Sequence, residues 1–255
     1  MKKVAIVTGA SSGMGREFVN TIDKRFSSID EIWLISRRRD KLEEVRAEVN
    51  KPCLIIDEDI SEAAFYYRFQ KILRQESPNV KMLINAAGFG MVGEFDDIAS
   101  EVLMGMVNTN CMGLTGMISL VIPYMCENSR IINFASSAAF TPQPGFSVYA
   151  ATKSYVLSLS RALNRELEKK GIYVTAVCPG PVATEFFTIA ESGKKRAWFK
   201  DVFMANKTDV VNQALSDSIN KKELSVYGMP MKLFMVMTKV LPHRLLLFFY
   251  KFLLK

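Results

Sequence analysis

The sequence predicts a doubly wound, parallel α/β sheet covered by helices on both faces, built as one domain over residues 1–255. Short apolar runs alternate with helical segments about six times along the chain. A glycine-rich turn follows the first apolar run, and no linker, internal repeat or low-complexity block interrupts the alternation. This pattern is typical of three-layer α/β proteins, in which a parallel sheet lies between two layers of helices.

The expected elements follow from the apolar runs and the turn residues between them. Strands are expected at residues 4–7, 31–36, 53–57, 80–84, around 131–132, 172–177 and 224–227. Helices are expected from the glycine turn to about residue 26 and at residues 62–76, 98–125, 149–170 and 208–220. Residues 186–206 are interpreted as an irregular segment over the substrate, and Pro242 divides an apolar helical tail at 229–255 into two pieces.

Composition favours a globular protein of a reducing compartment. Hydrophobic residues make up 49% of the chain, and the net charge of +7 suits a phosphate-bearing ligand or an anionic membrane surface. Four cysteines without a C-x-x-C pair, and a single histidine, predict free thiols and no metal site. No nucleic-acid-binding motif occurs, and the first apolar run is too short for a signal peptide. We therefore expect a cytoplasmic location.

The first functional pattern is the turn Thr8-Gly9-Ala-Ser-Ser-Gly13-Met-Gly15, between the first strand and the first helix. Glycines let the backbone turn sharply and approach a phosphate, while the helix N-terminus offers free N–H groups and the positive end of the helix dipole. The spacing G-x-x-x-G-x-G differs from the commoner G-x-G-x-x-G. Its position between a strand and a helix still indicates a nucleotide-binding site.

The end of the second strand indicates which nucleotide binds. In nucleotide-binding βαβ units an acidic residue here holds the ribose 2′-hydroxyl, whereas arginine accommodates a 2′-phosphate. Ser36 is followed by Arg37 and Arg38, and Asp40 already belongs to the next helix. The pattern favours NADP(H) over NAD(H), with Arg37 as the main contact and Arg38 as the second. The alternative is an ordinary basic helix start.

Three further polar residues have two interpretations each. Asp59 either accepts a hydrogen bond from an adenine amino group or is a plain loop acid beside Ser61, a candidate N-cap. Asn85, which opens Asn-Ala-Ala-Gly88, either ties adjacent strands or touches the cofactor. Asn110 lies within the helix expected at 98–125, where asparagine has poor propensity and, when buried, requires a partner or a function.

The residues with the clearest chemical meaning follow the apolar run at 131–132. Ser136 comes after that strand, and the next helix opens at Tyr149. Tyr149 and Lys153 are four residues apart, so they lie on one helix face. A phenol with a pKa near 10 is a poor acid or base at neutral pH, and a neighbouring ammonium lowers that pKa. A serine hydroxyl can hydrogen-bond the carbonyl oxygen of a substrate while the phenol protonates that oxygen. The three residues therefore predict interconversion of a ketone and an alcohol.

With these motifs in this order, the sequence resembles the short-chain dehydrogenase/reductase family over roughly residues 3–228. The resemblance implies a Rossmann-type fold and four catalytic residues, Asn110, Ser136, Tyr149 and Lys153. Tyr149 would be the general acid/base, and Lys153 would hold the nicotinamide ribose and lower the tyrosine pKa. Asn110 would position a water in the proton relay. Ser136 satisfies the family spacing to both Asn133 and Tyr149, and Ser137 is the runner-up.

The same resemblance implies the cofactor contacts and the assembly. Besides Arg37 and Arg38, the contacts are expected from Gly9, Ser11, Ser12, Gly13, Met14, Gly15, Asp59, Ile60, Asn85, Ala86, Gly88, Tyr149, Lys153, Pro179, Gly180, Val182 and Thr184. Ala86 stands where the family usually has a second asparagine. Family members commonly associate through the helix expected at 149–170, so a homodimer or homotetramer is expected.

We expect an NADP(H)-dependent oxidoreductase that acts on an apolar ketone or secondary alcohol, such as a hydroxysteroid or bile acid, a 3-oxoacyl chain or a similar lipid. The alternatives are a catalytically quiet NADP(H)-binding sensor and a protein that contacts membranes through residues 229–255. The intact Ser-Tyr-Lys set favours the enzyme. For the tail itself, a cover over the substrate pocket, a dimer contact and a membrane contact all remain open, because a mostly apolar helix must be buried or bound.

Overall fold

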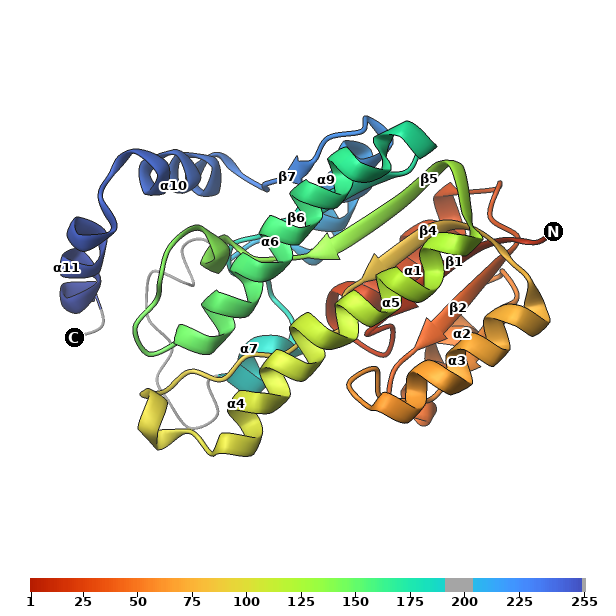
Figure 1. Ribbon diagram of the computed structural model, residues 1–255, viewed down its shortest axis with the longest axis horizontal. Helices are drawn as coiled ribbons and strands as arrows, with labels where there is room; N and C mark the ends of the chain where they lie inside the picture. Colours follow the sequence, from red (N-terminus) through yellow and green to blue (C-terminus); the bar gives the residue numbers. More distant parts are fainter. Residues whose placement is uncertain (191–203, 254–255) are drawn as a thin grey trace.

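The computed structural model describes residues 1–190 and 204–253, so most of the segment expected to be irregular, 186–206, lies outside the described part. Seven parallel strands form one sheet in the order β3-β2-β1-β4-β5-β6-β7 (Figure 1). They are β1 (Lys3–Thr8), β2 (Glu31–Ile35), β3 (Cys53–Ile56), β4 (Asn79–Asn85), β5 (Met125–Phe134), β6 (Tyr173–Val177) and β7 (Leu224–Ser225). The predicted doubly wound parallel sheet is therefore confirmed.

Helices cover both faces of this sheet and bury a separate apolar cluster on each (Figure 1). One face carries α1 (Gly13–Arg25), α2 (Arg39–Glu48) and α9 (Lys207–Ile219). The other carries α3 (Ala63–Glu76), α5 (Leu114–Val121) and α6 (Ser147–Leu167). Because both faces are covered, the central strands are apolar along nearly their whole length, as in the fully buried Ala5, Ile6 and Val7 of β1.

The remaining helices lie toward the carboxyl ends of the strands (Figure 1). They are α4 (Ser100–Val107), α7 (Glu185–Ala190), α10 (Met229–Val240) and α11 (His243–Leu253). Strand order reverses between β1 and β4, since β1 pairs with β2 on one side and β4 on the other. In open α/β sheets, ligands bind beyond the carboxyl ends of the strands at such a reversal.

Several expected elements differ in the structure. The helix expected at 98–125 is divided into α4, a π-helical turn at Asn108–Gly113, α5 and a 3₁₀ turn at Ile122–Tyr124. The helix expected at 149–170 begins at Ser147 and ends in a 3₁₀ turn before Gly171, whose φ of 68° reverses the chain. Residues 185–190 form α7, so the start of the 186–206 segment is helical rather than irregular.

One described stretch, Ser100–Tyr124, is long and apolar enough to cross a membrane by length and composition. Its second half, α5, buries Leu114, Met117, Ile118 and Val121 in the cluster between the sheet and α3 and α6. Core helices of this kind pass the same test, so we interpret this stretch as part of the core.

Candidate active site

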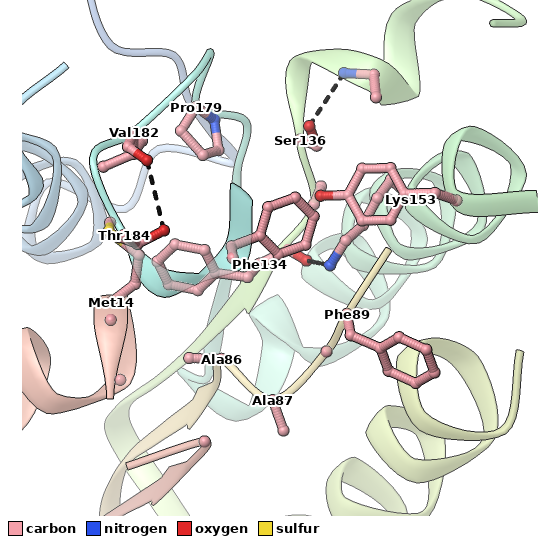
Figure 2. A pocket seen from close by; sticks show the side chains of 18 of the residues that line it. Met14, Ala86, Ala87, Phe89, Phe134, Ser136, Lys153, Pro179, Val182 and Thr184 are labelled. Carbon is pink, nitrogen blue, oxygen red and sulfur yellow. Dashed lines mark hydrogen bonds between the residues drawn. The ribbon is translucent and has the colours of Figure 1, made fainter. Parts of the chain in front are cut away.

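The carboxyl ends of the strands border a cavity of about 870 Å³. Its walls come from the glycine turn, the segments after β2, β4, β5 and β6, the start of α6, α7 and the first part of α10. Figure 2 shows Met14, Val182 and Thr184 on one side of this cavity, with Phe89 on the other. The cavity therefore joins a nucleotide-type turn to the residues expected to carry chemistry.

The glycine turn folds in a way that suits a phosphate. Gly9 and Gly13 have φ values of 68° and 54°. A Cβ on Gly9 would lie 2.8 Å from the backbone nitrogen of Ala87, and one on Gly15 would overlap the carbonyl oxygen of Gly9. At the start of α1 the Ser12 side chain makes no capping hydrogen bond, and the first turn contains no acidic residue. The helix N-terminus thus keeps free N–H groups for an anion, which fits a dinucleotide pyrophosphate.

The two arginines after β2 both line the cavity but have different partners. Arg37 is 74% exposed and pairs with Asp59, with 3.5 Å between its Nη1 and the carboxylate Oδ2. The Arg38 guanidinium lies over the turn, where Nη2 donates to Ser12 Oγ at 2.8 Å and Ser11 Oγ at 3.2 Å. The sequence pattern predicted Arg37 as the main contact and Arg38 as the second. In the structure the Arg38 guanidinium lies at least as close to the glycine turn as that of Arg37.

Asp59 and Asn85 have structural roles. The carboxylate of Asp59 lines the cavity but also accepts hydrogen bonds from the backbone and the hydroxyl of Ser61. Ser61 is not the N-cap of α3, because that position is held by Glu62. Asn85 is buried outside the cavity lining, and its amide donates to Asn133 Oδ1 at 2.8 Å across the β4–β5 pair. Of its two interpretations, the structure favours the tie between strands.

Ser136, Tyr149 and Lys153 meet at the end of β5. Ser136 caps a 3₁₀ turn by accepting from the Ala138 backbone at 3.1 Å, and Tyr149 and Lys153 share one face of α6. The Lys153 ammonium donates to the carbonyl of Phe134 at 2.7 Å, as Figure 2 shows. Its Nζ lies 5.6 Å from the Tyr149 ring centroid. Both candidate serines line the cavity, and Ser136 is the one whose side chain acts on the pKa of Tyr149.

Burial dominates the proton affinities of this group. It raises the pKa of Tyr149 well above 10, while the nearby Ser136 side chain acts in the opposite direction. Burial lowers the pKa of Lys153 to about 8. Burial thus raises the phenol pKa, whereas the sequence pattern predicted that Lys153 lowers it. Tyr149 is held as a neutral phenol, which is the form that donates a proton to a carbonyl oxygen.

Asn110 lies beside this group without lining the cavity. It is buried in the π-helical turn, where its side chain bonds both the N–H and the carbonyl of Phe89. Its amide also donates to Thr152 Oγ1 at 3.0 Å. A Cβ on Gly88 would lie 2.8 Å from Asn110 Oδ1, so the asparagine fixes the loop after β4 at close range. In this geometry its side chain positions backbone rather than facing the reacting groups.

The wall above Tyr149 is apolar and largely aromatic. The Phe146 ring stacks on Tyr149 with centroids 4.3 Å apart, and Phe186 approaches it at 5.3 Å. From α10, Met231 and Phe234 enter the same cavity. No motif marks these residues individually. Phe186 lies in the segment expected over the substrate, and Met231 and Phe234 lie in the tail for which a pocket cover was one alternative.

Most of the predicted site residues therefore share one cavity. Those in its lining are Gly9, Ser11, Ser12, Gly13, Met14, Gly15, Arg37, Arg38, Asp59, Ile60, Ala86, Gly88, Ser136, Tyr149, Lys153, Pro179, Gly180, Val182 and Thr184. Asn85 and Asn110 lie behind it. Asn85 bonds the Asn133 side chain and Asn110 bonds the Phe89 backbone, and a role for either residue toward a ligand stays a prediction.

Comparison with known proteins agrees with this geometry. A sequence profile described as short chain dehydrogenase matches residues 3–195. An uncharacterized oxidoreductase of Staphylococcus epidermidis is 28% identical over 88% of this chain and 96% of its own length. A very-long-chain 3-oxoacyl-CoA reductase of Anas platyrhynchos is 32% identical over 73% of this chain and 62% of its own.

A solved structure gives the same fold. The short-chain dehydrogenase from Sphingobium yanoikuyae in complex with NADPH is 26% identical, with a TM-score of 0.77 over 89% of this chain and 88% of its own. The profile match covers the glycine turn, the Ser-Tyr-Lys set and all of α7, whereas α10 and α11 lie beyond it. On this match the chain belongs to the short chain dehydrogenase family and is an oxidoreductase.

Proposed function

We propose that this protein uses NADPH to reduce an apolar ketone to a secondary alcohol, with Tyr149 as the proton donor. One observation carries the proposal: Ser136, Tyr149 and Lys153 converge at the end of a cavity that begins at an anion-binding glycine turn and ends in an aromatic wall. The reverse oxidation uses the same groups, and cofactor supply decides the direction.

The residues would divide the chemistry between them. The nicotinamide cofactor supplies the hydride. The Ser136 hydroxyl orients the carbonyl oxygen, and Tyr149 gives that oxygen its proton as negative charge develops there. Lys153, charged below its pKa of about 8, stabilises the phenolate that remains. Phe146 and Phe186 exclude water above the phenol, which strengthens these interactions.

NADP(H) is proposed over NAD(H) because two arginines and no acid end β2. The Arg38 position over Ser11 and Ser12, and the exposed Arg37 beside it, give a 2′-phosphate two guanidinium partners. NADPH is the cofactor bound in the Sphingobium relative, which supports this choice.

An apolar substrate is proposed because Phe89, Phe146, Phe186, Met231 and Phe234 line the cavity beyond Tyr149. The Anas relative reduces very-long-chain 3-oxoacyl-CoA, which supports an acyl-chain ketone, and a hydroxysteroid also fits an apolar wall.

A homodimer or homotetramer is proposed as well, since α4 and α6 expose Met104 and Tyr155. Sedimentation of the purified chain would test the assembly.

The function is tested by following nicotinamide absorbance with purified protein, NADPH or NADH, and a panel of 3-oxoacyl, steroid, sugar and small-ketone substrates. We expect turnover with NADPH on one apolar class. Turnover confined to sugars would contradict the apolar assignment. Tight NADPH binding with no turnover of any ketone or alcohol would contradict the reductase and favour a cofactor-sensing role.

A further inference from the structure

We propose that the outer face of α10, continued into α11, docks the protein on an anionic phospholipid surface. The docking surface is defined by Met229, Leu233, Val236, Met237 and Val240 of α10 with Leu245 of α11. The use of this surface to pass substrate into the cavity rests on the proposed function, but the docking itself does not.

The inner face of α10 is already occupied. Pro230, Met231 and Phe234 line the cavity, and a Cβ on Gly180 would lie 2.7 Å from the Met231 sulfur. Phe234 also approaches Phe140, with 6.3 Å between ring centroids, and Thr238 is buried on the same side. These contacts fix which side of the helix faces the fold, so the opposite side must face outward.

That outward side is apolar as well. Met229 is 76% exposed, Leu233 63% and Val240 74%, and these positions recur at the three- to four-residue spacing of a single helix face. Figure 1 shows α10 and α11 at one end of the molecule, beyond the strands, where no other labelled helix covers them. A large apolar helix face must be buried or bound, and among the described residues α10 buries only one of its two apolar faces.

The charge of residues 229–255 indicates what binds the docking surface. After Glu223 the chain has five basic residues, Lys232, Lys239, Arg244, Lys251 and Lys255, and no acidic residue. Lys232 and Lys239 are exposed and seven residues apart, so they flank the apolar stripe on one side. Lysines at the edge of an apolar helix face reach the head groups of anionic lipids, as in helices that lie in a membrane interface.

A second copy of the chain fits this surface less well. A two-fold contact would place the same basic patch on both sides, and like charges would then face each other. An anionic lipid surface complements the patch instead. Because α10 has one face on lipid and the other on the cavity, an apolar substrate could pass from the bilayer into the cavity along the edge of a single helix.

The experiment is vesicle flotation of the full-length protein, without substrate, on phosphatidylcholine vesicles with and without phosphatidylglycerol. We expect binding only to the mixed vesicles, and less of it at high salt. Lys232→Gln with Lys239→Gln should reduce the partition coefficient about thirty-fold, since each lysine near an anionic surface contributes about a fivefold factor. Leu233→Glu with Val240→Glu should abolish flotation.

Tyr67→Glu is the matched control, because Tyr67 is 74% exposed on α3, away from the tail. It should float like the natural chain, and circular dichroism should show that all variants are folded. No flotation on mixed vesicles, or flotation unchanged by the α10 substitutions, would overturn the proposal. Self-association that the Leu233 and Val240 substitutions abolish, without lipid binding, would assign the surface to a second copy. Each readout is independent of ketone reduction, so failure of the proposed function would be recognised separately.

Discussion

The cofactor side of the cavity and its substrate side come from different kinds of chain segment. The cofactor side is formed mainly by the segments that directly follow β1, β2, β3, β4 and β6, so most of its contacts lie within a few residues of a strand end. The substrate side is formed by Phe146, α7 and α10, which reach the cavity through packing between distant segments. The first side depends on local backbone geometry, whereas the second depends on how the chain closes over itself.

Tyr149 lies where the two sides meet, and its removal should have the largest effect. Tyr149→Phe keeps the ring that stacks on Phe146 but removes the proton donor, so kcat should fall about 10³-fold. NADPH affinity, measured by fluorescence titration, should stay within about twofold. The control is Tyr155→Phe, which alters an exposed tyrosine on the same helix and should leave kcat unchanged. Substantial residual turnover by Tyr149→Phe would place the proton donor elsewhere.

The cofactor side is tested by comparing the arginines after β2. Arg37→Ala and Arg38→Ala should each weaken NADPH binding about ten- to a hundredfold, since under the proposed function each removes a charged hydrogen-bond partner of the 2′-phosphate. NADH binding should change little. Arg39→Ala is the control, because Arg39 pairs with Asp57 outside the cavity lining. Equal losses for NADPH and NADH would mean that these arginines do not contact the 2′-phosphate.

The difference between the two sides also explains what could be read from the sequence. The sheet, the glycine turn, the arginines and the Ser-Tyr-Lys set were predicted, because strand, turn and helix patterns place these residues locally. The contacts of Met231 with Gly180 and of Phe234 with Phe140 join segments far apart in the chain. Apolar periodicity shows that a helix face is buried, but it does not show what buries it.

Two asparagines were harder to assign for physical reasons of their own. Asn85 faces Asn133 because β4 and β5 are neighbours in register, and strand neighbours follow from the fold rather than from either segment. Asn110 turns toward Phe89 because a π-helical turn changes the helix face at that position. A helical pattern read at a regular 3.6-residue period does not contain that change.

Asn85→Ala tests the assignment of Asn85 to the sheet. Removing the Asn85 amide leaves the buried Asn133 Oδ1 without its donor, so the free energy of unfolding should fall by about 1–3 kcal/mol. The measurement is denaturant unfolding, with NADPH affinity determined on the folded variant. We expect the affinity to stay within about threefold. Unchanged stability with a large loss of NADPH binding would return Asn85 to the cofactor site.

The pH profile tests how the two sides cooperate at Lys153. Burial lowers the lysine pKa to about 8 and raises that of Tyr149, so the phenol keeps its proton while the lysine loses its charge. Reductive kcat/KM should be level near neutral pH and fall about tenfold per pH unit well above 8. Lys153→Arg keeps its charge in this range, so its lower activity should not show that fall. A kcat/KM of the unsubstituted protein that rises with pH above 8 would contradict the role of a charged Lys153.

The smallest expected effect concerns the contact that joins the two sides. Arg38 Nη2 lies 3.4 Å from Glu185 Oε2, so the first residue of α7 shares the guanidinium that we assign to the 2′-phosphate. Both side chains are about half exposed, and such pairs contribute about 0–1 kcal/mol. Glu185→Gln should therefore strengthen NADPH binding by about two- to fivefold at low salt, because the carboxylate no longer competes with the phosphate.

The affinity of Glu185→Gln for NADH, which lacks the 2′-phosphate, should rise less than its affinity for NADPH. The control is Glu223→Gln, which should leave NADPH affinity unchanged because Glu223 pairs with Arg161 outside this cavity. Weaker NADPH binding by Glu185→Gln would mean that the ion pair instead holds α7 in the geometry that the cofactor requires. Either result measures how the cofactor side and the substrate side are coupled. In the first case the cofactor phosphate releases α7 from Arg38, and in the second the same contact keeps the aromatic wall over Tyr149 in place.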